Sequence, residues 1–147
     1  MTDIEMIIRP YLPEDENAVI LLWQECGLLR SWNDPKADIQ RKLKVNPELF
    51  LVGEVNGQIV ATAMGGYEGH RGWINYLAVS PAHRRKGLGI RIMKATEERI
   101  LAMGCPKINL QIRTDNPAAV KFYESIGYNT DDVVSMGKRL VHDDTGA

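Results

Sequence analysis

A basic turn that contains two glycines follows an apolar, strand-like stretch and opens a helical pattern. Arg84, Arg85 and Lys86 supply positive charge, and Gly87 and Gly89 allow a close approach to a ligand because they have no side chain. Unpaired N–H groups and the positive dipole end at the start of a helix also favour anions. The turn therefore predicts a binding site for a phosphate or pyrophosphate group.

Two common phosphate-binding patterns do not fit this turn. A Walker loop requires Lys-Ser or Lys-Thr after its last glycine, and that pair is absent after Gly89. A dinucleotide-binding loop requires a third glycine, and Ile92 stands at that position. The phosphate is therefore expected to belong to another class of ligand.

A second group of polar residues lies further along the chain. Asn116-Pro117 is expected to begin a short helix, in which Phe122 and Tyr123 share an apolar face. Taken singly, Asn116 is a good helix cap without any ligand, and Tyr123 is a typical core residue. The two residues become functional candidates through their register with the glycine turn.

Together the two segments resemble the GNAT superfamily of N-acetyltransferases. Its coenzyme A motif has Arg or Gln, two residues, Gly, one residue and Gly or Ala after a Leu-Ala-Val strand, as Arg84, Gly87 and Gly89 do here. Its other diagnostic segment runs from Asn through Phe-Tyr-Glu to Gly and an aromatic residue, as residues 116–128 do. Residues 28–35 and 64–72 further resemble a bacterial branch called YpeA-like, which has no settled acceptor.

The resemblance implies acetyl-CoA as the cofactor, held in a V between the strand ending at Val79 and the strand of residues 108–113. The N–H of Val79 would polarise the thioester carbonyl, and an acceptor amine would attack it directly. In the family the Asn reaches the pantetheine arm and the Tyr protonates the leaving thiolate. The residues expected to bind the cofactor are Leu77, Ala78, Val79, Arg84, Arg85, Lys86, Gly87, Leu88, Gly89, Ile90, Asn116 and Tyr123.

The general base is not evident from the sequence. Many relatives place a carboxylate on the strand that corresponds to residues 73–79, which has none here. Relatives that acetylate protein N-termini often use a later Glu, and that position is Gln111, an amide that cannot accept the proton. The remaining candidates are Glu68 and His70 in a glycine-rich turn, and Glu54. Of these, Glu68 is the predicted catalytic residue, although a carboxylate in a turn is commonly just solvated.

The acceptor is expected to be a small-molecule or peptide primary amine. A cleft walled by Trp23, Leu29 and Trp32, with Arg30 nearby, would suit an amine that carries an apolar part and a carboxylate. For Trp32 a role as a core plug is equally consistent with its position.

Composition excludes several other classes of protein. The length of 147 residues predicts one domain over residues 1–147. The chain has 18 basic and 19 acidic side chains, and its net charge of −1 predicts no nucleic-acid or membrane partner. Its 3 His and 2 Cys residues have no metal-binding spacing, so no metal is expected. No apolar run has spanning length and residues 1–3 begin no secretory signal, which predicts a cytoplasmic protein. Relatives often form homodimers, with the last strand a candidate for exchange.

The periodicities predict the elements that position these residues. Strands are expected at residues 5–9, 49–55, 58–64, 73–79, 108–113 and 133–140, and helices after Pro13 and Pro35, at 87–103 and after Pro117. Asn56-Gly57 marks a hairpin. This order predicts an α+β fold of GNAT type, with a central, mostly antiparallel twisted sheet and helices on both faces.

Two other functions remain open at this point. A non-catalytic module that binds acyl-CoA as a sensor or regulator would explain the missing base, whereas Tyr123 argues against it. A nucleic-acid-binding domain that uses Arg84, Arg85 and Lys86 is the weaker alternative, because the net charge is near zero.

Overall fold

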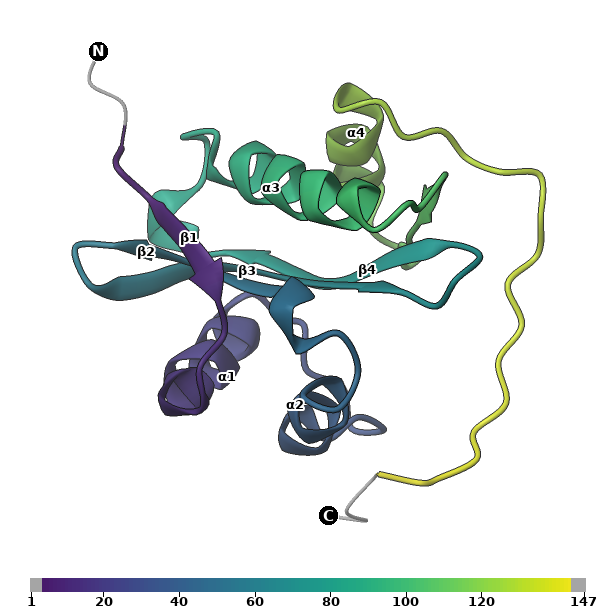
Figure 1. Ribbon diagram of the computed structural model, residues 1–147, viewed down its shortest axis with the longest axis horizontal. Helices are drawn as coiled ribbons and strands as arrows, with labels where there is room; N and C mark the ends of the chain where they lie inside the picture. Colours follow the sequence, from purple (N-terminus) through teal and green to yellow (C-terminus); the bar gives the residue numbers. More distant parts are fainter. Residues whose placement is uncertain (1–3, 144–147) are drawn as a thin grey trace.

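A five-stranded sheet lies between two pairs of helices in the computed structural model, which describes residues 4–143 (Figure 1). The strands are adjacent in chain order and antiparallel, except for the parallel pair formed by the last two. Their bounds are β1 Ile7–Pro10, β2 Phe50–Val55, β3 Gln58–Tyr67, β4 Gly72–Val79 and β5 Ile108–Asn109. The predicted α+β class is confirmed.

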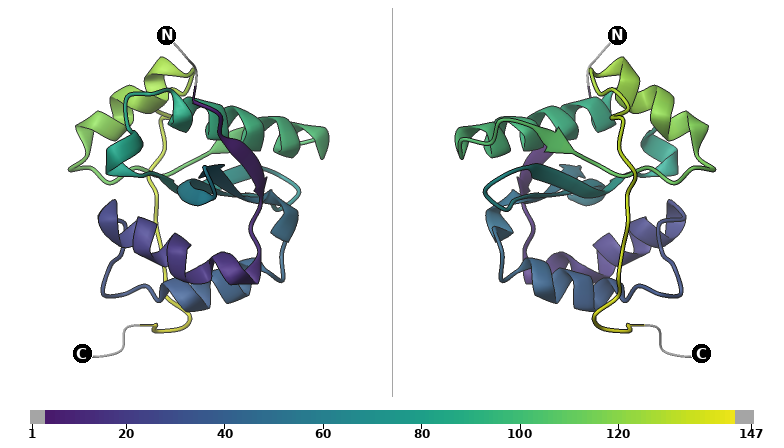
Figure 2. Two further views of the ribbon diagram at one scale, coloured as in Figure 1. Left: turned by 90° about the vertical axis from the view of Figure 1, so that its left-hand side faces the viewer. Right: turned by 90° about the vertical axis from the view of Figure 1, so that its right-hand side faces the viewer.

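The helices cover both faces of the sheet, α1 and α2 on one side and α3 and α4 on the other, as both side views in Figure 2 also show. Their bounds are α1 Glu16–Glu25, α2 Pro35–Lys42, α3 Leu88–Ala102 and α4 Pro117–Ser125, with short 3-10 turns at Pro13–Asp15, Pro47–Leu49 and Pro81–His83.

Local sequence signals explain where several elements begin. The Asp34 carboxylate accepts hydrogen bonds from the N–H groups of Lys36 (3.0 Å) and Ala37 (3.3 Å), which caps α2. Between β2 and β3, Asn56 and Gly57 both have positive φ (51° and 77°), as the turn of a two-residue hairpin requires. The predicted cap and the predicted hairpin are both confirmed.

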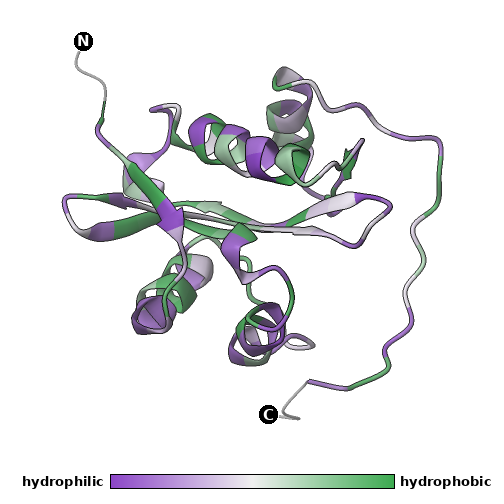
Figure 3. Ribbon diagram, in the orientation of Figure 1, coloured by the Kyte–Doolittle hydropathy of each residue, from purple (hydrophilic) through white to green (hydrophobic). Residues whose placement is uncertain are grey.

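A hydrophobic core lies on each face of the sheet, between the strands and the helices. Figure 3 shows the hydrophobic residues of both in green. On the α3 side, Leu88, Ile92 and Ile100 are buried against β2, β3 and β4. On the other side, Trp23 of α1 and Phe50 of β2 are stacked and fully buried. The sheet is therefore packed against helices on both faces.

The strand predicted at residues 133–140 is wrong. Residues 129–143 form an extended segment without a strand, and it passes around the β5 edge of the sheet toward α2 (Figures 1 and 2). Side chains hold it: Asp131 accepts from Lys107 and Asn109, both at 2.8 Å, and Ser135 bonds to Gln111. Val134 and Met136 stay 86% and 92% exposed, so nothing buries the apolar residues that suggested a strand.

Two smaller predictions also need correction. The strand expected at residues 108–113 is limited to Ile108–Asn109, because the chain diverges from β4 beyond that point. The helix expected at residues 87–103 is Leu88–Ala102, with Gly87 and Met103 as its caps. The prediction about residues 1–3 falls outside the described residues, as do residues 144–147.

Candidate active site

A V-shaped cleft opens between β4 and the segment that follows β5. The two strands pair at Gly72 with Ile108 and at Trp73 with Asn109, and they diverge beyond these pairs. A cavity of about 1350 Å³ surrounds residues 105–114 and extends from Trp73 and Asn75 of β4 to α4 and residues 126–135. Its walls include Asn75 on β4, Gln111 and Arg113 after β5, and Tyr123 and Tyr128 from α4 and the turn behind it. Of the residues expected to bind the cofactor, Tyr123 lines this cavity, whereas residues 77–79 and the basic turn do not, so the cofactor position stays a prediction.

The basic turn lies at the end of β4, where α3 begins. Gly87 is the N-cap of α3 with φ +76°, and its lack of a side chain leaves the cap without a side-chain hydrogen bond. The first backbone bond of the helix runs from Arg91 N–H to Gly87 O at 3.1 Å, so the N–H groups of Leu88, Gly89 and Ile90 have no helical acceptor. These groups can donate to a bound anion.

The turn is fastened to β4 and to α4. Arg84 Nε donates to the carbonyl of Val79 at 3.2 Å, while Arg85 lies in the left-handed region with φ +63°. A Cβ atom on Gly89 would lie 3.3 Å from Phe122 Cζ and 3.5 Å from Val79 Cγ2. The end of β4, the start of α3 and α4 therefore meet at Gly89.

Tyr123 lies in the cleft with a protonated phenol. Its ring makes edge-to-face contacts with Phe122 and Tyr128, at centroid distances of 5.2 and 5.8 Å. Burial raises the pKa of Tyr123 to about 12, so the hydroxyl keeps its proton at neutral pH and can act as an acid. Asn116 caps α4, with its Oδ1 accepting from Ala119 N–H at 3.1 Å, and its Nδ2 can still donate to a ligand.

The residues expected to form an acceptor cleft lie in different places. Trp23 is completely buried, so its side chain belongs to the core and walls no cleft. Leu29 is partly buried against the same core, and the Arg30 guanidinium donates to the carbonyls of Gly27 and Leu29 at 2.7 and 3.1 Å. Trp32 is 43% exposed.

Trp32 nevertheless contacts a residue of the cleft wall. The guanidinium carbon of Arg113, which lines the cavity, lies 5.4 Å from the centre of the Trp32 ring. This cation–π contact joins the segment between α1 and α2 to the second arm of the V.

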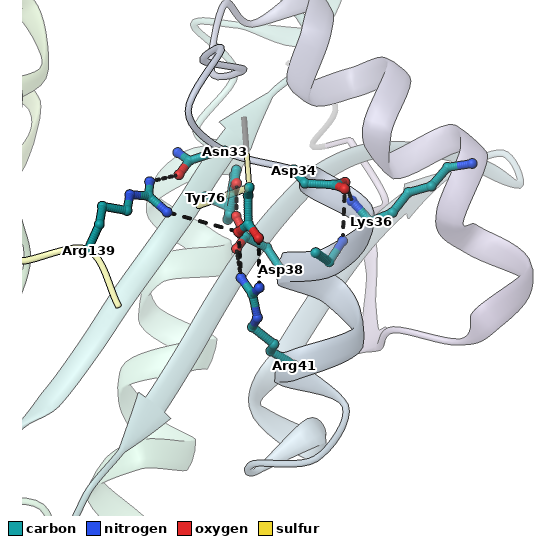
Figure 4. Close-up of polar contacts among 9 residues, drawn as sticks. Asn33, Asp34, Lys36, Asp38, Arg41, Tyr76 and Arg139 are labelled. Carbon is teal, nitrogen blue, oxygen red and sulfur yellow. Dashed lines mark hydrogen bonds and ion pairs between the residues drawn. The ribbon is translucent and has the colours of Figure 1, made fainter. Parts of the chain in front are cut away.

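A tyrosine–carboxylate pair that the sequence analysis did not identify lies on the α2 side of β4. The hydroxyl of Tyr76 donates to Asp38 Oδ2 at 2.6 Å (Figure 4). Burial, and then the hydrogen bond to Asp38, raise the pKa of Tyr76. Tyr76 has φ +51° beside an irregularity in the register between Thr62 and Met64 of β3, where β4 contains an extra residue.

Comparison with known proteins identifies the family. Residues 16–128 match the Acetyltransferase (GNAT) family. The chain belongs to this family. A GNAT relative called "Acetyltransferase", from Yersinia pestis (strain Pestoides F), is 50% identical over 138 residues, which cover 94% of this chain and 98% of the relative.

Solved structures share the GNAT fold. Ard1 from Thermoplasma volcanium has a TM-score of 0.73 and 28% identity, over 83% of this chain and 81% of Ard1. AAC(6')-Iy in complex with the bisubstrate analogue CoA-S-monomethyl-acetylneamine has a TM-score of 0.75 at 16% identity, over 92% of this chain and 99% of the other. The protein is therefore a GNAT-type acetyltransferase, and the YpeA-like assignment stays a prediction.

The carboxylates proposed from the sequence as the base of this GNAT protein lie away from the cleft. Glu68 accepts from the N–H groups of His70 and Arg71 in the turn between β3 and β4, and these backbone bonds lower its pKa. That turn adjoins the closed end of the V, where β4 begins. Glu54 is paired with Arg9. The geometry therefore disfavours Glu68 and Glu54 as the base.

Both cysteines of the GNAT chain are free thiols. Cys105 is buried, and Cys26 Sγ donates to the carbonyl of Val79 at 3.3 Å. Within residues 4–143, no group of three or more His, Cys, Asp or Glu side chains could hold a metal ion. None of the helices described in that range combines the length and apolarity needed to cross a membrane.

Proposed function

We propose that this protein is an acetyl-CoA-dependent N-acetyltransferase that transfers an acetyl group to a primary amine by direct attack in a ternary complex. One observation carries the proposal. The start of α3 has no side-chain cap, and its basic turn is fastened to the end of β4, where the β5 side of β4 is unpaired. Tyr123 lines the cleft on that side.

The residues present fit coenzyme A. The N–H groups of Leu88, Gly89 and Ile90, with the basic turn, would hold the pyrophosphate. Ser80 N–H donates to Val60 O of β3 at 2.7 Å, so the N–H of Val79 points the other way, toward the open edge of β4. That edge, at Leu77, Ala78 and Val79, would pair with the pantetheine arm.

The protein's own groups then assist the reaction. Acetyl-CoA supplies an activated acetyl thioester when it is bound. The N–H of Val79 is a fixed donor for the negative charge that develops on the thioester oxygen. Tyr123 holds its proton on Oη until the thiol leaves, because burial keeps its pKa near 12.

Calorimetric titration with acetyl-CoA tests the cofactor site. The native protein should bind with micromolar affinity, and an Arg85→Glu, Gly89→Glu double variant should lose binding, because it places two negative charges at the anion site. Thiol release from acetyl-CoA in the presence of primary amines then tests transfer. No binding by the native protein would overturn the proposal.

The second candidate is an acyl-CoA-binding sensor without turnover. It is favoured by one observation, since the cleft contains the amide of Gln111 where some relatives have a carboxylate. Binding of acetyl-CoA without thiol release for any amine would support the sensor. The acceptor, the cytoplasmic location and the homodimer stay predictions, and light scattering of the purified protein would test the dimer.

A further inference from the structure

The structure offers a proton acceptor for the reaction that the sequence left without a base. We propose that Tyr76 takes the proton from the attacking amine and passes its own hydroxyl proton to Asp38. The inference rests on the proposed transfer to an amine and deepens it by assigning the base.

The position of Tyr76 fits this role. It immediately precedes residues 77–79, the open edge of β4 proposed for the thioester arm, and follows Asn75, which lines the cleft. Its side chain packs on the α1 and α2 face of the sheet, the face from which Trp32 reaches over to Arg113. In the proposal the acceptor enters between α2 and the second arm of the V, so that its amine reaches the Tyr76 hydroxyl.

The hydrogen bond defines the direction of proton movement. Because Tyr76 Oη donates to Asp38 Oδ2 at 2.6 Å, the lone pairs of Oη are available to accept from an amine. The raised pKa of Tyr76 keeps this phenol protonated at neutral pH, so it can pass on its own proton as it receives another. Asp38, in contrast, does not have to touch the amine.

The neighbouring groups hold Tyr76 in this orientation. The Trp23 ring stacks on it with centroids 3.8 Å apart, and Trp23 Nε1 donates to Thr62 Oγ1 at 2.9 Å. Thr62 Oγ1 in turn donates to the carbonyl of Tyr76 at 2.8 Å. The left-handed backbone of Tyr76, which an L-residue rarely adopts, is thus braced from α1, β3 and α2.

The charged groups around Asp38 do not compete with Tyr76 for the Oδ2 atom of Asp38. Arg41 makes a two-pronged pair with Asp143, at 2.6 and 2.8 Å, and lies 3.6 Å from Asp38 Oδ1 (Figure 4). Arg139 bonds to Asn33 and lies 3.9 Å from Asp143. Asp34, at the start of the same helix, adds a second negative charge near Tyr76. The closest cation is therefore engaged mainly by Asp143.

The proposed step is balanced. The amine nitrogen forms a bond to the acetyl carbon, and the bond from that carbon to sulfur breaks. The nitrogen proton goes to Tyr76 Oη, while the Tyr76 hydroxyl proton goes to Asp38 Oδ2. Tyr123 gives its proton to the sulfur. Exchange with water then returns one proton to Tyr123 and removes one from Asp38.

Tyr76→Phe tests the inference with Tyr67→Phe as a matched control. Each variant loses one hydroxyl, but Tyr67 donates to Gly69 in the turn at the closed end of the cleft. The amine probes are n-butylamine, phenethylamine, glycinamide and neamine. We expect kcat of Tyr76→Phe to fall about 100-fold with the best probe, as the loss of a general base does. Its calorimetric affinity for acetyl-CoA should match that of Tyr67→Phe, whose kcat should be native. Its melting temperature should be lower than that of Tyr67→Phe, because Asp38 loses a part-buried hydrogen bond.

The outcomes separate this inference from the proposed function. If the native protein releases thiol with no probe, the proposed transfer fails, and the base assignment fails with it. If the native protein is active and Tyr76→Phe stays within threefold of its kcat, only the base assignment is overturned.

Asp38 is a positioning residue in this scheme, and its test is a pH profile. Asp38→Asn keeps the shape of the side chain but cannot take the proton, so its kcat should depend more steeply on hydroxide concentration from pH 6 to 9 than the native kcat measured with the same amine. Asp38→Glu should restore the native pH dependence. A uniform loss of kcat at every pH, in both variants, would show a structural role and contradict the inference.

Discussion

The surroundings of Tyr123 indicate its chemical role directly. Burial raises its pKa to about 12, so its hydroxyl holds a proton at neutral pH that it can give to the leaving thiolate. Replacement of Tyr123 with Phe removes the proton while keeping the ring contacts with Phe122 and Tyr128. We expect kcat to fall about 100-fold at unchanged calorimetric affinity for acetyl-CoA. Equal turnover in the two proteins would exclude Tyr123 as the acid.

Arg9 and Asp15 form an ion pair whose carboxylate is buried, and this pair makes the stability of the protein depend on pH. The Arg9 guanidinium donates two hydrogen bonds to the Asp15 carboxylate, at 2.7 and 2.9 Å, and Leu12 N–H donates a third. These bonds, chiefly those from Arg9, lower the pKa of Asp15 below 3.8. As the pH falls, Asp15 is therefore protonated at a higher pH in the unfolded chain than in the folded chain. The stability that Asp15 contributes is present above pH 3.8 and is lost as the pH falls through the pKa of Asp15 in the folded chain.

Urea unfolding at a series of pH values measures this effect. The free energy of unfolding of the native protein should fall more steeply below about pH 4.5 than that of Asp15→Asn. Arg9→Met should cost about 3 kcal/mol at pH 7, because it leaves a buried carboxylate unpaired. If native and Asp15→Asn proteins have parallel profiles, the pair does not contribute as derived.

At the residue scale the sequence predicted the backbone of the basic turn better than the surroundings of the residues expected to form the acceptor cleft. Gly87 and Gly89 act through backbone geometry, which a local pattern records. Trp23 was placed in a cleft because side-chain type alone does not tell which face of a helix is covered by the sheet. The pair of Asp38 and Tyr76 depends on a contact between distant elements and on a left-handed tyrosine, and no local pattern predicts either.

At the scale of elements, two adjacent glycines on β3 differ in what surrounds them. A Cβ atom on Gly65 would lie 2.7 Å from Thr96 Cγ2 and 3.2 Å from the carbonyl of Leu49, so α3 packs directly on the strand there. A Cβ atom on Gly66 would meet only the flexible end of Lys42, at 3.3 Å. The first glycine is thus required for helix packing and the second is not.

This difference predicts opposite tolerance to alanine. Gly65→Ala should lower the free energy of unfolding by about 1–3 kcal/mol through overpacking. Gly66→Ala should change it by less than about 0.5 kcal/mol, because the lysine can move aside. Urea titrations of both variants and the native protein provide the measurement, and equal losses would contradict the packing argument.

Elements with a local start signal were predicted well, and those that need a distant partner were not. Asp34-Pro35 and Asn56-Gly57 specify their own backbone geometry, so α2 and the β2–β3 hairpin follow from a few residues. A strand exists only where a second strand supplies hydrogen bonds. Residues 133–140 have a strand-like composition, but the β5 edge meets this segment through side chains alone.

At the scale of the whole molecule, the segment of residues 129–143 connects layers without belonging to a core. Its contacts run from Asp131 at the β5 edge to Arg139 and Asp143 beside α2. The buried apolar residues of the described chain end at Cys105, so the segment contributes none of them. Charge pairs on exposed surface stabilise weakly, which makes this segment the easiest part of residues 4–143 to detach.

Limited proteolysis tests this division between body and segment. Trypsin should cut after Lys138 and Arg139 before it cuts at the basic residues within residues 4–128, because a protease needs an extended, accessible backbone. A chain ending at Thr130 should melt within about 3 °C of the native protein, since no core side chain is lost. Mass spectrometry of the fragments and thermal melting give the two readouts. First cuts inside the body, or a melting temperature lower by about 10 °C, would show that the segment is part of the cooperative fold.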